Sequence, residues 1–229
     1  MLKQSKLKDG KDGEEKEKLP ERAILPKLDM LAVARPNSID DDTWLENVIL
    51  EDLEFLSAVA VGVSIVSSIV RNVDLSNSKI KGFRMNDVEV EKMSLVNADL
   101  DYASIDRVMI TGSRLTGVKL AGNGSSIRDV VFKGCKLDWS TLRFAKITSV
   151  RFENCVLSDS DFVGAELEDV TFSESDLSNA DFSQAKMKRV DVSGSKIEGI
   201  KIAPQQLGGL MVDHSQALYV VQLMGVRVK

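Results

Sequence analysis

The sequence predicts an all-β solenoid, because two periods run through most of its 229 residues. The first period is five residues: a large apolar side chain recurs at every fifth position, with a small or β-branched residue two positions before it. The series extends from Leu75 to Leu120 and, after a slip of two residues, from Ile127 to Ile202. This period fits neither an α-helix nor a flat strand, whose side chains repeat about every 3.6 and 2 residues. It fits a chain that turns a corner every five residues and points one large and one small side chain inward.

The second period is twenty residues. Identical residues recur at this interval in both inward positions: Val130, Val150, Val170 and Val190 in the small one, and Phe132, Phe152 and Phe172 in the large one. Four corners therefore complete one coil, and residues twenty apart stack at a strand spacing of about 4.8 Å. Extended back to Leu45, the phase gives about eight coils, which need capped ends because bare terminal coils expose strand edges.

Several segments carry a family resemblance: "VNADLDYASI" (96–105), "SDSDFVGAEL" (158–167) and "SESDLSNADFSQAKM" (173–187). They resemble the A(D/N)LXX pattern of pentapeptide-repeat proteins, and the resemblance covers about residues 43–203. It implies a right-handed quadrilateral β-helix. The family spans many roles, so the resemblance indicates the fold more specifically than the function.

Four regions follow from this phase. Residues 1–20 are rich in lysine and acids and are expected to form a disordered charged tail. Residues 21–42 carry apolar side chains between prolines and are expected to cap the first coil. Residues 43–203 form the β-helix, and residues 204–229 form a C-terminal helical cap.

Apolar residues fill outward positions of the first coils that hold polar residues elsewhere: Ile49, Leu56, Val59, Val61, Val66 and Ile69. An exposed apolar surface of this extent is normally covered. Either residues 22–35 fold back over it, or it is an interface for a partner or a second copy.

Two further features interrupt the repeat. The segment "AGNGSS" (121–126) holds the slip and suits a bulge at a corner. After Pro204, "DHSQALYVVQLMGV" predicts a helix capped by Asp213 or Ser215 and ended by Gly225, and the terminal "VRVK" suits a strand. In several pentapeptide-repeat proteins a similar helix also forms a two-fold dimer, so a homodimer through this helix is a second expectation.

Composition argues against several classes of function. A net charge of −5 disfavours nucleic-acid binding through a broad basic surface, and one histidine with two cysteines cannot assemble a zinc or haem site. We see no nucleophile–base pair, phosphate loop or paired-carboxylate cleft, so no enzyme activity, metal or cofactor is expected. His214 is interpreted as a residue of the helix start. The absence of a signal-peptide pattern or a membrane span predicts a soluble, cytoplasmic protein.

Charge is uneven, because nine acids and no basic residue lie between Phe152 and Ala185. One interpretation is phosphate mimicry, in which the acids dock in a basic DNA channel. The other is a ladder of ion pairs between residues twenty apart, each worth a few tenths of a kcal/mol. The pairs expected are Glu153 with Lys133, Glu166 with Lys146 and Lys186, Glu168 with Lys188, Asp169 with Arg189, and Asp176 with Lys196. Four acids escape this pairing and are candidate partner-binding residues: Asp159, Asp161, Glu174 and Asp181.

Two outward aromatic residues, Trp139 and Phe144, are the other candidate partner-binding residues. Phe144 is expected to stack between Gly124 and Gly164, so its ring either covers bare backbone or contacts a partner. Cys135 and Cys155 are stacked inward neighbours and are expected to be small core residues; a disulfide is near the allowed spacing but is not implied.

Two functions of different class follow. The resemblance implies a DNA mimic that binds DNA gyrase or topoisomerase IV, inhibiting it or protecting it from antibiotics. The alternative is a protein-interaction scaffold with an unknown partner. A continuous negative stripe on the folded rod would favour mimicry, and a belt of alternating sign would favour the scaffold. A purely structural role is a third possibility.

Overall fold

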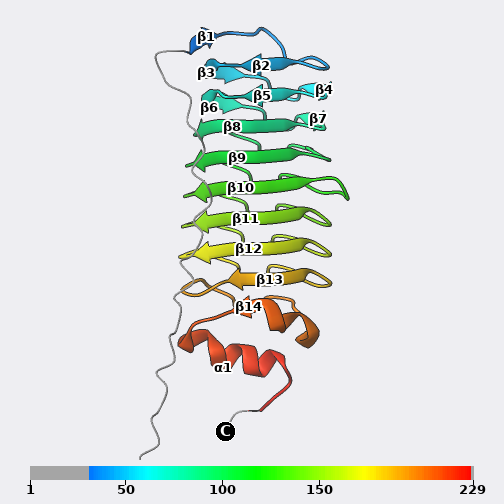
Figure 1. Ribbon diagram of the computed structural model, residues 1–229, viewed down its shortest axis with the longest axis vertical. Helices are drawn as coiled ribbons and strands as arrows, with labels where there is room; N and C mark the ends of the chain where they lie inside the picture. The colour runs from blue at the N-terminus through cyan, green and yellow to red at the C-terminus, as the bar shows by residue number, and fades with distance from the viewer. Residues whose placement is uncertain (1–30, 228–229) are drawn as a thin grey trace, which may run out of the picture.

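The structure is a computed structural model that describes residues 31–227. The chain forms a parallel β-solenoid of about 9 turns with one short C-terminal helix, where the repeat phase predicted about eight coils. The coils stack in chain order from β1 at one end to β14 and α1 at the other (Figure 1). The predicted all-β fold, with its C-terminal helix, is therefore confirmed.

The larger sheet runs along the whole solenoid. In spatial order its main path is β1 (Ala32–Ala34), β3 (Val48–Glu54), β6 (Ile69–Asp74), β8 (Arg84–Glu91), β9 (Ser104–Thr111), β10 (Ser126–Lys133), β11 (Lys146–Glu153), β12 (Glu166–Ser173), β13 (Lys186–Asp191) and β14 (Leu210–Met211). In the same sheet, β5 (Ser64–Val66) pairs with β2 (Trp44–Glu46) and with β8. A second, two-stranded sheet joins β4 (Val59–Val61) and β7 (Lys79–Lys81).

The strand register confirms the twenty-residue coil. Ile127 pairs with Ile147 between β10 and β11, whereas Ile105 pairs with Ile127 between β9 and β10. The offset therefore grows by two residues between β9 and β10, as the slip predicted. The extra residues form a turn at 122–124, and the hydroxyl of the buried Ser125 closes it by donating to the Ala121 carbonyl at 2.7 Å.

We number the four sides of a coil 1 to 4 by their large inward residues, which in residues 126–145 are Ile127, Phe132, Leu137 and Leu142. Long strands such as β10 cover sides 1 and 2, while single bridges, for example Lys136 to Val156 and Thr141 to Asp161, join the coils on sides 3 and 4.

Each corner residue lies two positions after the large inward residue and has a left-handed backbone. In this coil the φ values are 52° at Asp129, 60° at Gly134, 58° at Trp139 and 59° at Phe144. Glycine, asparagine and aspartate adopt this conformation at the lowest cost, which accounts for their frequency at corners. A bulky corner residue such as Trp139 or Phe144 departs from that preference.

Stacked aromatic rings fill the C-terminal half of the core. Phe132, Phe152 and Phe172 are parallel neighbours with ring centroids 4.9 Å apart, and Phe162 stacks on Phe182 at 4.8 Å. Phe162 also meets Phe172 edge-on at 6.1 Å, which links side 4 to side 2. Identical side chains in consecutive coils thus pack as a column, since the vertical spacing of the coils is close to that of stacked rings.

The six apolar residues predicted to form one outward surface in the first coils do not form one. Ile69 is buried, with 1% of the residue exposed, and Ile49 and Val66 are half-buried. Val59 is 74% exposed, and Leu56 and Val61 are also exposed. The exposed ones lie on sides 3 and 4 and the covered ones on sides 1 and 2.

The N-terminal regions proposed from the sequence are only partly described. Residues 1–30, which include the predicted charged tail and most of the segment 22–35, lie outside the described residues. Within the described part, β1 pairs with β3 through Ala32 and Val48 and thereby covers side 2 of the first full coil. Coverage by residues 22–30 stays a prediction.

Two glutamines cap the C-terminal end. In the short 3₁₀ helix η2 (Pro204–Gly209), the Gln206 amide donates to the carbonyls of Phe182 and Ala185, both at 2.8 Å. In α1 (His214–Leu223), the Gln216 amide donates to Val192 and Ser195, both at 2.7 Å. These amides supply the hydrogen bonds that a further coil would make. In the described part of the chain, no helix is long and apolar enough to cross a membrane.

The helix begins as predicted, with Asp213 as its N-cap. The strand expected in "VRVK" is not seen at Val226 and Arg227, and the last two residues lie outside the described range. Neither η2 nor β14 was predicted from the sequence, although β14 keeps the twenty-residue register, since Val190 pairs with Leu210 and Asp191 with Met211.

The Asp213 cap predicts a dependence of stability on pH. Its carboxylate accepts hydrogen bonds from the Ser215 hydroxyl at 2.6 Å and the Gly194 amide at 2.7 Å, and these lower the pKa of Asp213 to about 2. A carboxyl with a lowered pKa in the folded state stabilises it above its unfolded pKa of about 4, and this contribution is lost as the pH falls towards 2. The melting temperature of Asp213→Asn should therefore lie below that of the wild type at pH 7, and the difference should shrink at pH 2. A difference that is independent of pH would contradict this role of the charge.

Candidate functional site

The acidic region between Phe152 and Ala185 is largely neutralised within the protein. Seven of its nine carboxylates form ion pairs: Glu153 with Arg151, Asp161 with Arg143, Glu166 with Lys186, Glu168 with Lys188 and Arg189, Asp169 with Arg189, Asp176 with Lys196, and Asp181 with Lys201. Four of the five expected ladder acids pair with a basic residue twenty positions on. Glu153 instead pairs with Arg151 of its own strand at 3.3 Å, although Lys133 is its neighbour in the adjacent strand.

Two of the four acids predicted to be unpaired are in fact paired. Asp181 lies 3.6 Å from Lys201, its neighbour in the next coil, and Asp161 lies 3.4 Å from Arg143 of the preceding coil. The second contact is diagonal, since the residues are not twenty apart, and the long arginine side chain spans it. Asp161 and Asp181 do stack on each other as predicted, and each carboxylate also accepts a backbone N–H two residues on, at 2.9 Å.

Asp159 and Glu174 have no ion-pair partner among residues 31–227. Both are corner residues with left-handed backbones: Asp159 lies between sides 3 and 4, and Glu174 between sides 2 and 3. Glu174 lines a shallow depression of about 430 Å³ together with Val156 and Gly194. Of the predicted acids, these two are therefore the ones available to a partner.

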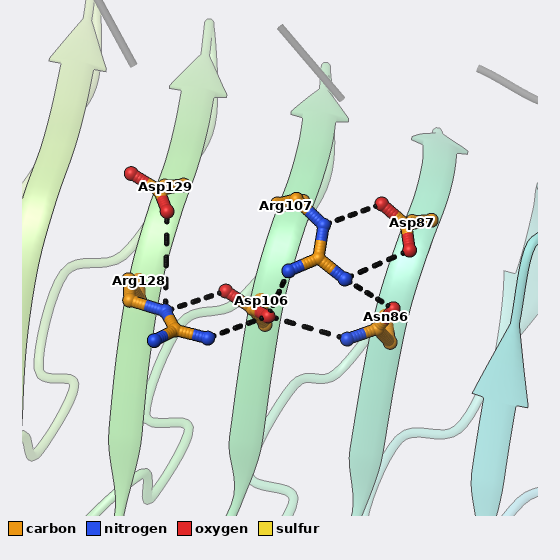
Figure 2. Close-up of polar contacts among 6 residues, drawn as sticks. All are labelled: Asn86, Asp87, Asp106, Arg107, Arg128 and Asp129. Atoms are coloured by element: carbon orange, nitrogen blue, oxygen red, sulfur yellow. Dashed lines mark hydrogen bonds and ion pairs between the residues drawn. The ribbon is translucent and has the colours of Figure 1, made fainter. Parts of the chain in front are cut away.

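A second group of charges lies on side 1 and at its corner with side 2, in β8, β9 and β10 (Figure 2). Arg107 donates to both carboxylate oxygens of Asp87 at 2.7 and 2.9 Å, to Asn86 at 2.7 Å, and to Asp106. Arg128 binds Asp106 with two further hydrogen bonds, at 2.8 and 2.9 Å. One half-buried network thus joins three consecutive coils.

The network is saturated with opposite charges. The hydrogen bond from Arg128, with help from Arg107, lowers the pKa of the buried Asp106, and the bond to Asp87 raises the pKa of Arg107. A carboxylate that is already bound by two guanidinium groups offers little to a further ligand. We interpret the network as a clamp between coils. The network was not predicted from the sequence. Its pairs nevertheless follow from the repeat: Asp87 and Arg107 are twenty residues apart, and Asp106 and Arg128 are twenty-two apart because the two-residue slip lies between them.

The two candidate aromatic residues differ in what they contact. The Phe144 ring lies over Gly164 of the next coil, so closely that a Cβ on that glycine would be 2.5 Å from the ring. Arg143 lies 5.9 Å from the ring centroid. Phe144 therefore covers bare backbone, one of the two expected roles, and 47% of it is still exposed. Tyr102, which lies at the same corner two coils before Phe144, covers Gly124.

Trp139 is 65% exposed and lies at the corner between sides 3 and 4. The next residue of its corner column is the unpaired Asp159, one coil further on. Trp139 and Phe144 lie at opposite ends of side 4 in one coil, with Arg143 between them in sequence. The structure thus places Trp139 beside an available acid and Phe144 beside a cation.

Cys135 and Cys155 are free thiols in the core. Each donates to a backbone carbonyl of an earlier coil at 3.4 Å, as the serines of the same column do. The neighbouring Cys135 thiol and burial raise the pKa of Cys155, so it is held as a neutral thiol. Within residues 31–227, no group of three or more His, Cys, Asp or Glu residues could hold a metal ion.

Comparison with known proteins agrees with this geometry. Residues 125–202 match the family described as the pentapeptide repeat region. No curated protein is similar enough in sequence to count as a relative. A solved structure of QnrB1, a plasmid-mediated fluoroquinolone resistance protein, is 18% identical with a TM-score of 0.51, over 84% of this chain and 100% of QnrB1.

HetL is a pentapeptide repeat protein involved in heterocyst differentiation regulation in the cyanobacterium Nostoc sp. strain PCC 7120. It is 17% identical, with a TM-score of 0.44, over 75% of this chain and 90% of HetL. At such identities, structural likeness concerns the fold alone. The matched repeats and the likeness to QnrB1 lead to one conclusion: residues 125–202 belong to the pentapeptide-repeat family, and the chain has the pentapeptide-repeat β-helix fold.

Proposed function

We propose that this protein is a non-enzymatic interaction scaffold that binds a protein partner through its rigid surface. The observation that carries the proposal is the 65% exposure of Trp139 beside the unpaired Asp159. Tryptophan is one of the three residue types most enriched among those that dominate binding energy, and its large apolar ring with one polar N–H suits an interface. The paired charges of side 1 form the belt of alternating sign that favours a scaffold over a DNA mimic.

The two aromatic residues differ in how well they serve as test positions. Because Phe144 covers Gly164, its loss would disturb the solenoid, whereas Trp139 can be removed with little effect on folding. The partner is first isolated by co-purification with the wild type. If the scaffold proposal is correct, Trp139→Ala should raise the Kd for this purified partner about tenfold or more, as measured by calorimetry. Thr141→Ala, on side 4 of the same coil, is the matched control and should bind normally. If Trp139→Ala binds as tightly as the wild type, this surface is not the scaffold's interface.

The second candidate function is a DNA mimic that binds DNA gyrase or topoisomerase IV. Its support is the fold shared with QnrB1 together with the two free carboxylates, Asp159 and Glu174. The pairing of the other seven acids weakens it, because charges that face a partner within the chain attract a basic DNA channel less strongly. If the mimic is correct, micromolar protein should change gyrase supercoiling or rescue it from a fluoroquinolone, and Asp159→Asn with Glu174→Gln should abolish the effect. No effect at that concentration would refute it.

A homodimer through α1 and a cytoplasmic location complete the proposal. Leu218 and Met224 of the α1 region are exposed, and a two-fold contact between helices would cover them. The free thiols of Cys135 and Cys155 fit a reducing compartment.

A further inference from the structure

We propose that side 3 of the C-terminal coils binds an extended peptide segment that is rich in lysine or arginine and carries one large apolar side chain. This inference rests on the scaffold function proposed above and names the chemistry of its partner. It is based on apolar exposure, a depression in the surface, and charges that the protein does not neutralise itself.

Apolar groups and a depression occupy this side. Trp139 lies at its corner with side 4, and Val156, 37% exposed, lies on the side itself. The depression that Val156 lines with Glu174 persists because the next corner residue of that column is Gly194, whose φ is 73° and whose missing side chain has no neighbour within 4 Å. A partner side chain can enter there and contact Val156.

The charges of side 3 remain available to a partner. Among the described residues, Asp159, Glu174 and Glu198 have no ion-pair partner, whereas Asp176 is engaged by Lys196 at 3.5 Å. Asp138 accepts a hydrogen bond from Thr116 at 2.8 Å. Within residues 31–227, Lys136 is the cation of this side that has no ion-pair partner, so free negative charge exceeds free positive charge. Side 1 of the same coils differs, because Glu166 is bound by Lys186 and Glu168 by Lys188 and Arg189.

The spacing of the free acids fits an extended chain. Asp159, Glu174 and Glu198 belong to three consecutive coils, so the first and last are about 10 Å apart along the axis at a coil spacing of about 4.8 Å. Three to four residues of an extended peptide span this distance at about 3.3 Å each. Free carboxylates repel nucleic acid and anionic membranes and attract lysine and arginine. A basic peptide therefore fits this side better than either.

A defined peptide tests the inference with the full-length protein. The probe is the heptapeptide amide Lys-Lys-Leu-Lys-Leu-Lys-Lys, titrated into isotope-labelled protein and followed by NMR, with a matched peptide in which glutamate replaces every lysine. We expect shifts at the Trp139 indole and at the amides of Val156 and Glu174, micromolar affinity, and weaker binding in 0.5 M salt. The glutamate peptide should not bind.

Two variants locate the interaction. The double substitution Glu174→Gln and Glu198→Gln should weaken peptide binding about five- to tenfold, and Glu89→Gln on side 2 is the control that should not. Shifts confined to other sides, equal binding of the glutamate peptide, or an unchanged affinity of the double variant would overturn the inference. Stronger binding of a DNA duplex than of the peptide would also overturn it.

The same variants separate this inference from the scaffold proposal. If Trp139→Ala loses the native partner but the Glu174→Gln and Glu198→Gln variant keeps it, the scaffold stands and the basic peptide is wrong. If the native partner is insensitive to Trp139→Ala while the peptide still maps to side 3, the peptide site stands and the scaffold interface lies elsewhere.

Discussion

Replacing Phe152 with alanine is expected to lower the free energy of unfolding by about 3–5 kcal/mol, the usual cost of removing a buried aromatic ring. Phe152 is fully buried in the middle of a column, with Phe132 and Phe172 each 4.9 Å away. Its loss leaves a cavity that the neighbouring coils cannot close, because their vertical spacing is fixed by the hydrogen bonds between strands. Both stacking contacts disappear together.

Urea unfolding followed by circular dichroism measures this effect. Phe152→Leu should cost less, since leucine refills most of the volume, and Val156→Ala in the same coil should cost less than 1 kcal/mol because Val156 is partly exposed. A loss for Phe152→Ala that is no larger than for Val156→Ala would mean that the column does not stabilise the solenoid.

Replacing Gln216 with leucine is expected to lower the free energy of unfolding by roughly 2–4 kcal/mol, since a buried polar group left without a partner costs about 1–3 kcal/mol. The Ser195 carbonyl and the Asp213 N–H would each lose their contact with the Gln216 side chain, whereas the Val192 carbonyl still accepts the Ser195 N–H at 3.1 Å. The Gln216 amide donates to the carbonyls of Val192 and Ser195, and its own side chain is buried. Leucine matches its size but offers no donor. The last coil would then lose the hydrogen bonds that replace those of a further coil.

Hydrogen exchange locates this loss. The amides of residues 190–200 should exchange faster in Gln216→Leu, while those of β10 and β11 should change less, because each coil contacts only its neighbours. Gln222→Leu is the matched control, since Gln222 is an exposed residue of the same helix. Equal effects of the two substitutions would show that α1 packs on the coil without capping it.

The core could be predicted from the sequence because an inward position repeats every five residues, so each pentapeptide by itself shows which of its residues faces inward. Val130, Phe132, Cys135 and Leu137 are all buried where the period places them. The two-residue slip was also predictable, because it shifts the apolar series itself. The burial of Ile69 was not predictable, since a residue that faces outward in the repeat can still be covered by other parts of the chain.

The charged surface was predictable only where partners are twenty residues apart. The twenty-residue spacing predicted the pair of Glu166 with Lys186, and the same spacing relates Asp181 to Lys201, a pair that was not predicted. It could not give the contact of Arg143 with Asp161, which runs diagonally between coils. A long side chain can reach several charged neighbours, and which of them it contacts depends on the geometry of the coils. The spacing of residues in the sequence does not define that contact.

The sequence by itself determined the solenoid, its coil length and its slip, because inward packing follows from a period that each pentapeptide repeats. The tertiary structure decided which surface residues are free. It paired Asp161 and Asp181, left Asp159 and Glu174 unpaired, and placed Phe144 over a glycine of the next coil. In the folded protein, the Gln216 amide also donates hydrogen bonds to carbonyls 24 and 21 residues away in the sequence. These outcomes depend on how side chains of neighbouring coils lean towards each other, which only their positions in three dimensions define.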